Sequence, residues 1–134
     1  MTPAAATLKR EEAAAARKEL EDRLALHLRA HRVPHVREFS LPGRQFRWDF
    51  AFPESRLLVE VHGGIWRAKG AHNTGAAITR DCEKSAYAAG LGWRTFSVTG
   101  EQIVNGNAYA WIKKALEAPT STPAAGTGEQ PAQP

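Results

Sequence analysis

The sequence predicts one domain of mixed α/β (α+β) class, in which helices flank a mixed β-sheet with an antiparallel hairpin, in the order α-β-β-β-α-β-α. Three observations predict it: leucines at helical spacing near the N-terminus, alternating aromatic residues followed by an apolar run, and helix-forming stretches around a third strand. The 134 residues, 43% of them hydrophobic, suffice for one compact core and are too few for two. We place the domain at residues 11–117, between a flexible N-terminus (1–10) and a disordered Pro/Ala-rich tail (118–134).

The first predicted helix runs over residues 9–32. Leu20, Leu24 and Leu28 recur every four positions, which is the spacing of a buried stripe on an amphipathic helix. Pro34 cannot continue a helix, so we expect the helix to end before it.

The hairpin is predicted in the middle of the chain. A short strand over residues 36–39 precedes residues 45–52, where aromatic and smaller or polar residues alternate as in a strand with one buried face. A turn at residues 53–56 then leads into the apolar run 57–61. The aromatic side chains expected to share one face are Phe46, Trp48, Phe50 and Phe52.

The second half of the chain completes the predicted sheet. Residues 63–75 are rich in glycine, and we expect a mobile loop there. Helix formers follow over residues 76–89, then a strand over 93–99 and a last helix around 101–116.

Charge and composition limit the possible functions. The net charge of +4 and a pI near 9.6 favour a polyanionic partner without proving one. No apolar run is long enough to cross a membrane and the N-terminus lacks a signal-peptide layout, so we expect a soluble, cytoplasmic protein. The single Cys82 excludes an internal disulfide and a zinc site built on a Cys pair.

Two acidic residues, Asp49 and Glu60, are predicted to meet across the hairpin. If the turn is centred on residues 54–55, Phe50 lies opposite Val59 and Asp49 opposite Glu60, both acids on the less apolar face. Directly opposed like charges are destabilising, and Mg²⁺, which prefers carboxylate oxygens, would compensate them. A turn with an odd number of residues would shift the register by one and place the acids on different faces, and this alternative stays open.

Five segments of the sequence together resemble the PD-(D/E)XK nuclease superfamily. The resemblance is closest to its small branch of very-short-patch-repair-like and DUF559-type endonucleases, many of them phage or prophage encoded, and it covers about residues 18–105. The segments are FRWDFAFP (46–53), VEVHGGIW (59–66), HNTG (72–75), DCEK (81–84) and GWR (92–94).

The resemblance implies a restriction-endonuclease-like core and hydrolysis of DNA phosphodiester bonds with Mg²⁺ or Mn²⁺. Asp49 and Glu60 would bind the metal through their carboxylates and Val61 through its backbone carbonyl. Mismatch-specific and structure-specific cleavage, including junction resolution, both fit a role in DNA repair or recombination. The alternative is a module that binds DNA on this scaffold without cutting it.

Three further residues are candidates for the catalytic site. His62 stands where lysine is usual, and it would position or deprotonate the water or bind metal through a neutral imidazole nitrogen. Lys84 would supply the missing cation; Asp81, three residues earlier on the same predicted helix, would extend the cluster or pair with Lys84. Glu21 matches a helix acid that this branch places near the metals.

Basic and aromatic residues around the predicted site are candidates for DNA contact. Side chains of this kind bind phosphates or stack on bases. They are Arg44, Arg47, Trp66, Arg67, Lys69, His72 and Arg80. A homodimer is compatible with the sequence but does not follow from it.

Overall fold

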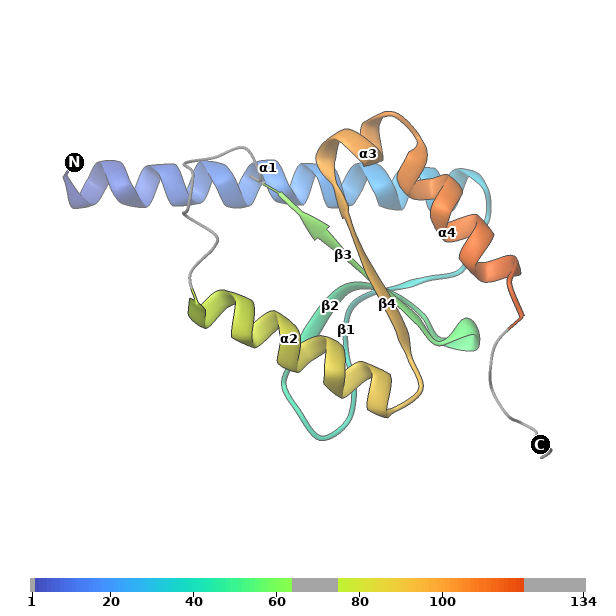
Figure 1. Cartoon of the computed structure of the whole chain (residues 1–134). Coiled ribbons are helices and arrows are strands. Elements are labelled where there is room, and N and C mark those ends of the chain that lie inside the picture. The colour runs from blue at the N-terminus through green and yellow to red at the C-terminus, as the bar shows by residue number, and fades with distance from the viewer. Residues whose placement is uncertain (1, 64–74, 120–134) are drawn as a thin grey trace.

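Helices cover both faces of a four-stranded sheet in the computed structural model, which describes residues 2–63 and 75–119. The long helix α1 and the two C-terminal helices pack on one face, and α2 packs on the other (Figure 1). The elements are α1 (Pro3–Ala30), β1 (Val36–Ser40), β2 (Arg47–Phe52), a 3-10 turn η1 (Pro53–Ser55), β3 (Leu57–His62), α2 (Gly75–Gly90), β4 (Arg94–Thr99), α3 (Gly100–Val104) and α4 (Asn107–Glu117).

The predicted fold class and element order are confirmed, with two corrections at the helices. The first helix begins at Pro3 and not at residue 9 as predicted, because Thr2 caps it by accepting the Ala5 N–H and proline suits the first helical position. The expected last helix is two helices, since the chain breaks at Gly106, which adopts a positive φ of 90°.

The sheet has the strand order β1-β2-β3-β4, with β1/β2 and β2/β3 antiparallel and β3/β4 parallel. Phe50 pairs with Val59 and Phe52 with Leu57, which is the register predicted from an even turn. The paired positions of β2 and β3 end at Phe50 and Val59, so Asp49 and Glu60 lie one step beyond the ladder.

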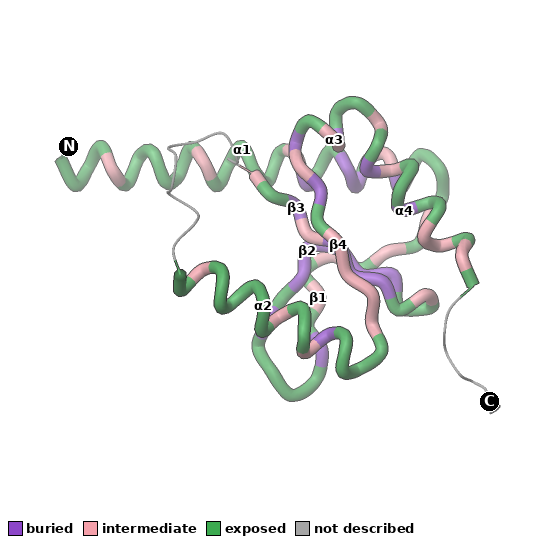
Figure 2. Tube along the Cα trace, viewed as in Figure 1, coloured by how far each residue is buried: buried purple, intermediate pink, exposed green. Residues whose placement is uncertain are grey.

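Two hydrophobic clusters, one on each face of the sheet, hold the layers together. Figure 2 shows buried residues along the strands and on the helices that pack against them. Phe50 and Phe52 pack against α1, α3 and α4, whereas Phe46 and Trp48 belong to the cluster under α2. The prediction that all four aromatic side chains share one face is therefore wrong. The strict two-residue alternation is lost around Asp49, where β2 leaves its ladder with β3.

The N-terminal half of α1 projects beyond the sheet (Figure 1) and is almost entirely exposed. Its buried stripe begins at Glu21 and continues through Leu24, Ala25 and Leu28. Within residues 2–63 and 75–119, no helix combines the length and apolar character that crossing a membrane requires.

Candidate metal and nucleic-acid site

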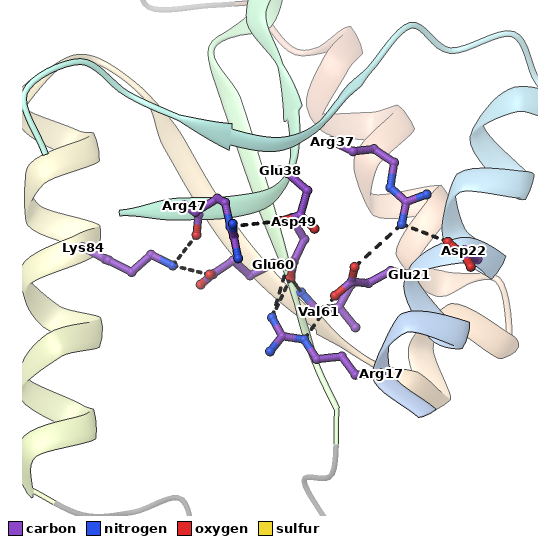
Figure 3. A network of polar contacts seen from close by, with 10 residues as sticks. All are labelled: Arg17, Glu21, Asp22, Arg37, Glu38, Arg47, Asp49, Glu60, Val61 and Lys84. Atoms are coloured by element: carbon purple, nitrogen blue, oxygen red, sulfur yellow. Dashed lines mark hydrogen bonds and ion pairs between the residues drawn. The ribbon is translucent and has the colours of Figure 1, made fainter. Parts of the chain in front are cut away.

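Three carboxylates from three elements converge where β2 separates from β3 (Figure 3). Glu21 comes from α1, Glu38 from β1 and Asp49 from β2, and one oxygen of each lies within 4.8 Å of the others. We call these three residues the acidic centre. Hard oxygen donors in this number are the ligands that Mg²⁺ and Mn²⁺ prefer.

Asp49 lies at the opening between the two strands. Its Oδ2 accepts the backbone N–H of Val61 at 2.8 Å, so the side chain replaces the backbone acceptor that a continued ladder would have supplied. Asp49 is only 8% exposed. The protein itself thus fixes the Asp49 carboxylate beside the end of β3, without the help of a ligand.

Glu21 is buried to the same extent as Asp49, at 8% exposure, whereas Glu38 is exposed. Burial raises the pKa of its carboxyl above the usual range, and the charge of Asp49 raises it further. Arg17 and Arg37 lower that pKa, but they do not cancel the two larger effects. A carboxylate that is costly to ionise here is one that a divalent cation would stabilise.

Glu38 reaches the centre through an unusual backbone conformation. Its φ is +55°, in the left-handed region that non-glycine residues rarely adopt. Arg37 and Phe39 pair with Phe50 and Trp48 on either side of it, but Glu38 is not among the paired positions of β1 and β2. The distortion presents the Glu38 carboxylate to the other two acids, while Arg47 pairs with it at 2.9 Å.

Arg17 is the cation that contacts the acidic centre from α1. Its Nε lies 3.2 Å from Glu21 Oε2, and its Nη2 donates to both Asp49 oxygens at 3.2 and 3.3 Å. Partial burial alone would lower the pKa of Arg17, but the charge and hydrogen bonds of Asp49 raise it above its ordinary value. Arg17 therefore stays charged and offsets part of the negative charge of the centre.

Glu60 takes a different partner on the opposite side of the sheet. Its carboxylate is paired with Lys84 of α2, and Lys84 Nζ also donates to the Arg47 carbonyl oxygen at 2.8 Å. Val59 and Val61 pack toward α1, so strand alternation turns Glu60 toward α2. The expectation that Asp49 and Glu60 share a face is wrong, because β2 loses its regular alternation at Asp49.

The Lys84 side chain is only 13% exposed, and its contacts with Glu60 and the Arg47 carbonyl oxygen fix its position. Its ammonium lies 4.9 Å from the centre of the Trp48 ring. A small cavity of about 120 Å³ lies beside it and is lined by Glu60, His62 and Asp81 among others. His62 thus lies on the Glu60 side of β3, as expected for residues two apart on a strand.

A larger cleft of about 540 Å³ joins the two groups of residues. Both Asp49 and Glu60 line it, so a ligand in the cleft can reach acids from either side of the sheet. Its basic lining residues are Arg17, Arg44, Arg47, Arg80 and Lys84. A cleft with five cationic side chains and two carboxylates suits a polyanion that approaches a metal.

Two arginines of the cleft are stacked on aromatic rings. The guanidinium of Arg44 lies 4.3 Å from the centre of the Phe46 ring, and that of Arg80 lies 5.2 Å from it on the helix side. Stacking restricts these long side chains without neutralising their charge. Both guanidinium groups are therefore held in place beside the cleft.

The remaining predicted DNA contacts lie outside the described residues. They are Trp66, Arg67, Lys69 and His72. Two residues of the site, Arg17 and Glu38, were not predicted from the sequence. Arg17 stands four residues before Glu21 on the same helix face, which is a readable signal; the left-handed Glu38 has none.

Comparison with known proteins supports the fold. No protein-family model matches the chain, and no curated protein matches it in sequence. Among solved structures, the chain is similar to the catalytic domain of the homing endonuclease I-Bth0305I, with a TM-score of 0.56 and 16% sequence identity over 72% of this chain and 91% of that domain. The chain therefore has a nuclease-like α+β fold.

Proposed function

We propose that this protein is a divalent-metal-dependent DNA endonuclease of the PD-(D/E)XK type, related to the very-short-patch-repair-like and DUF559-type branch. The observation that carries the proposal is an acidic centre of which one member, Asp49, also lines a cleft with five basic side chains. The nuclease-like fold supports it independently.

The donor set fits Mg²⁺ or Mn²⁺. The oxygens of the acidic centre lie within 4.8 Å of one another, so small side-chain movements would let all three acids reach one Mg²⁺ or Mn²⁺ ion. Asp49 and Glu21 are the proposed carboxylate ligands, with the Val61 carbonyl beside them because Asp49 already holds the Val61 amide. Glu38 is the third acid within reach.

A metal bound there would supply an acidified water and a positive charge beside the phosphate. The protein's own residues do the rest. Arg44, Arg47 and Arg80 would hold the DNA backbone in the cleft through phosphate contacts.

Glu60, His62 and Lys84 are proposed to act from the α2 side of the sheet, where all three line the small cavity. Lys84 would supply the positive charge that the usual lysine provides, with Glu60 holding its ammonium in place. His62 would accept the proton of the attacking water, since a neutral imidazole is a suitable general base near neutral pH. Glu60, which we expected as a metal ligand, would bind metal only after Lys84 moves away.

A cleavage panel tests the proposal. We expect purified protein to nick or cut at least one of plain duplex, a T·G mismatch, a four-way junction and single-stranded DNA in Mg²⁺ or Mn²⁺, and EDTA to stop the reaction. Asp49→Asn and Glu21→Gln should lose activity, whereas Lys18→Gln, a charge change on the exposed face of α1, should retain it. Failure to cleave any substrate in either metal would overturn the proposal.

A second candidate function is DNA binding without cleavage. Arg17 already compensates Asp49 and Glu21 with a guanidinium, and lysine is absent at position 62. This candidate predicts salt-sensitive DNA binding that ignores EDTA and survives Asp49→Asn. Metal binding that disappears in Asp49→Asn would count against it.

A further inference from the structure

Arg17 contacts the acidic centre, but the proposed chemistry gives it no role. Its guanidinium bridges two of the three acids, contacting Glu21 at 3.2 Å and Asp49 at 3.2 and 3.3 Å. The same side chain is 47% exposed and lines the basic cleft. Arg17 therefore lies at the boundary between the proposed metal site and the proposed DNA surface.

The end of β3 fixes the place of Arg17. A Cβ on Gly63 would stand 3.1 and 3.2 Å from the Arg17 Cβ and Cγ, which is closer than ordinary packing allows. The absence of a side chain at Gly63 lets α1 approach the strand that carries Val61 and His62. The guanidinium lies beyond that contact, on a side chain that is 47% exposed and lines the cleft.

A divalent cation and the Arg17 guanidinium would compete for the same oxygens. The arginine donates to both oxygens of Asp49 and to one of Glu21, leaving these atoms with fewer free lone pairs. Two cations within a few ångströms of each other repel strongly in a partly buried site. Metal binding and the observed position of Arg17 are therefore mutually unfavourable.

We propose that Arg17 is an internal counter-cation that leaves the acidic centre when metal binds and then contacts a DNA phosphate in the cleft. This inference rests on the proposed function, because it takes the acidic centre as the metal site. It makes metal binding and DNA binding mutually reinforcing through one side chain. Such coupling is reciprocal, so DNA that draws Arg17 away must also tighten metal binding.

The first test measures metal binding without DNA. We expect Arg17→Gln to bind Mn²⁺ at least about tenfold more tightly than the wild type in calorimetry, because a competing positive charge has been removed. Arg17→Lys keeps the charge and should stay near the wild-type affinity. Lys18→Gln removes a charge one residue away, where Lys18 pairs with Asp22, and should change little.

The second test measures how DNA affinity depends on salt, using fluorescence anisotropy of a short labelled duplex. Each phosphate contact adds about 0.9 to the slope of log affinity against log salt concentration. In EDTA the slopes of wild type and Arg17→Gln should agree, since Arg17 is held by the acids. In Ca²⁺, added as a non-cleaving probe, the slope of the wild type should be steeper than that of Arg17→Gln by about 0.9, the contribution of one phosphate contact.

Four outcomes would overturn the inference. Weaker or unchanged Mn²⁺ binding in a folded Arg17→Gln variant would show that Arg17 orders the acids instead of competing with metal. If the slopes of wild type and Arg17→Gln differ by the same amount in EDTA and in Ca²⁺, Arg17 contacts DNA to the same extent with and without metal. If the wild type binds no Mn²⁺, both the proposed metal site and this inference fail. If the wild type binds Mn²⁺ and cleaves DNA, but Arg17→Gln has the same Mn²⁺ affinity and the same salt slopes, the proposed function stands and only this inference fails.

Discussion

Asp49 accepts the backbone N–H of Val61 at 2.8 Å, and this bond stands where the β2–β3 ladder would otherwise continue. The proposed central metal ligand is thereby also a structural partner of the strand end that carries the other site residues. Two different substitutions of Asp49 can distinguish its proposed role as a metal ligand from its role as the acceptor of the Val61 N–H.

Asp49→Asn and Asp49→Ala should differ in stability although both abolish metal binding. Asparagine keeps an oxygen that can accept the Val61 N–H, whereas alanine leaves a buried amide without its partner, at a cost of about 1–3 kcal/mol. Denaturant unfolding in EDTA measures the difference between the two variants. Equal stability would mean that the Asp49–Val61 bond contributes nothing to the fold.

Glu21→Gln should stabilise the metal-free protein at neutral pH. Burial, with the charge of Asp49, raises the pKa of Glu21, so protonation of this group favours the folded state and its ionisation costs stability as pH rises through that raised pKa. A neutral glutamine avoids this cost. The midpoint of thermal unfolding should therefore be higher for the variant at pH 7–8, with the gain shrinking below the ordinary glutamate value of 4.5.

The same comparison in saturating Mn²⁺ provides the control. Metal stabilises the ionised form of its ligands, so the wild type should gain more from Mn²⁺ than Glu21→Gln does. A stability gain for the variant that is independent of pH would contradict the cause we assign.

Several parts of this arrangement follow from the sequence by simple physical rules. The even turn at residues 53–56 sets the Phe50–Val59 register, because loop length fixes pairing in a hairpin. Glu21 was a candidate through the family resemblance alone, and the structure places it at the first position of the buried stripe that Leu24 and Leu28 continue. A charged residue at such a position indicates a partner or a ligand.

Other parts depend on tertiary structure and could not be predicted. The alternation rule assigned Trp48 and Phe50 to one face, but β2 is distorted at Asp49 and the two rings lie in different clusters. The distortion also turns Asp49 and Glu60 toward partners on opposite sides of the sheet. Only the packing of α1 and α2 decides which face each acid meets.

Glu38→Gly and Glu38→Ala form a matched pair that tests the left-handed backbone. Both remove the carboxylate and its exposed ion pair with Arg47, which contributes little. Glycine also relieves the positive φ, so it should be about 1 kcal/mol more stable than alanine. Both variants should bind Mn²⁺ more weakly than the wild type if Glu38 belongs to the metal site; calorimetry and chemical denaturation measure the two effects.

Glu60 and Lys84 should be coupled energetically. A double-mutant cycle with Glu60→Gln and Lys84→Met isolates the pair, and we expect about 1 kcal/mol. This value lies at the low end for contacting residues because a quarter of the Glu60 side chain, 25%, is exposed and solvent screens the charges. The control pair Lys113 and Glu117 on α4 is more exposed and should show weaker coupling.

Gly63→Ala should move Arg17 without removing its charge. The new Cβ would stand 3.1 Å from the Arg17 Cβ and 3.5 Å from its Cα, so α1 must shift by a few tenths of an ångström. Overpacking of this kind should destabilise the protein by about 1 kcal/mol or more. Because the guanidinium is drawn away from Asp49, Mn²⁺ affinity should rise in the same direction as in Arg17→Gln, though by less. Gly90→Ala is the control, since a Cβ there would meet no described residue within 4 Å beyond the adjacent backbone of its own helix, and alanine favours the helix. If Gly63→Ala loses stability but its Mn²⁺ affinity is unchanged, the packing of α1 at Gly63 does not control the contact between Arg17 and Asp49.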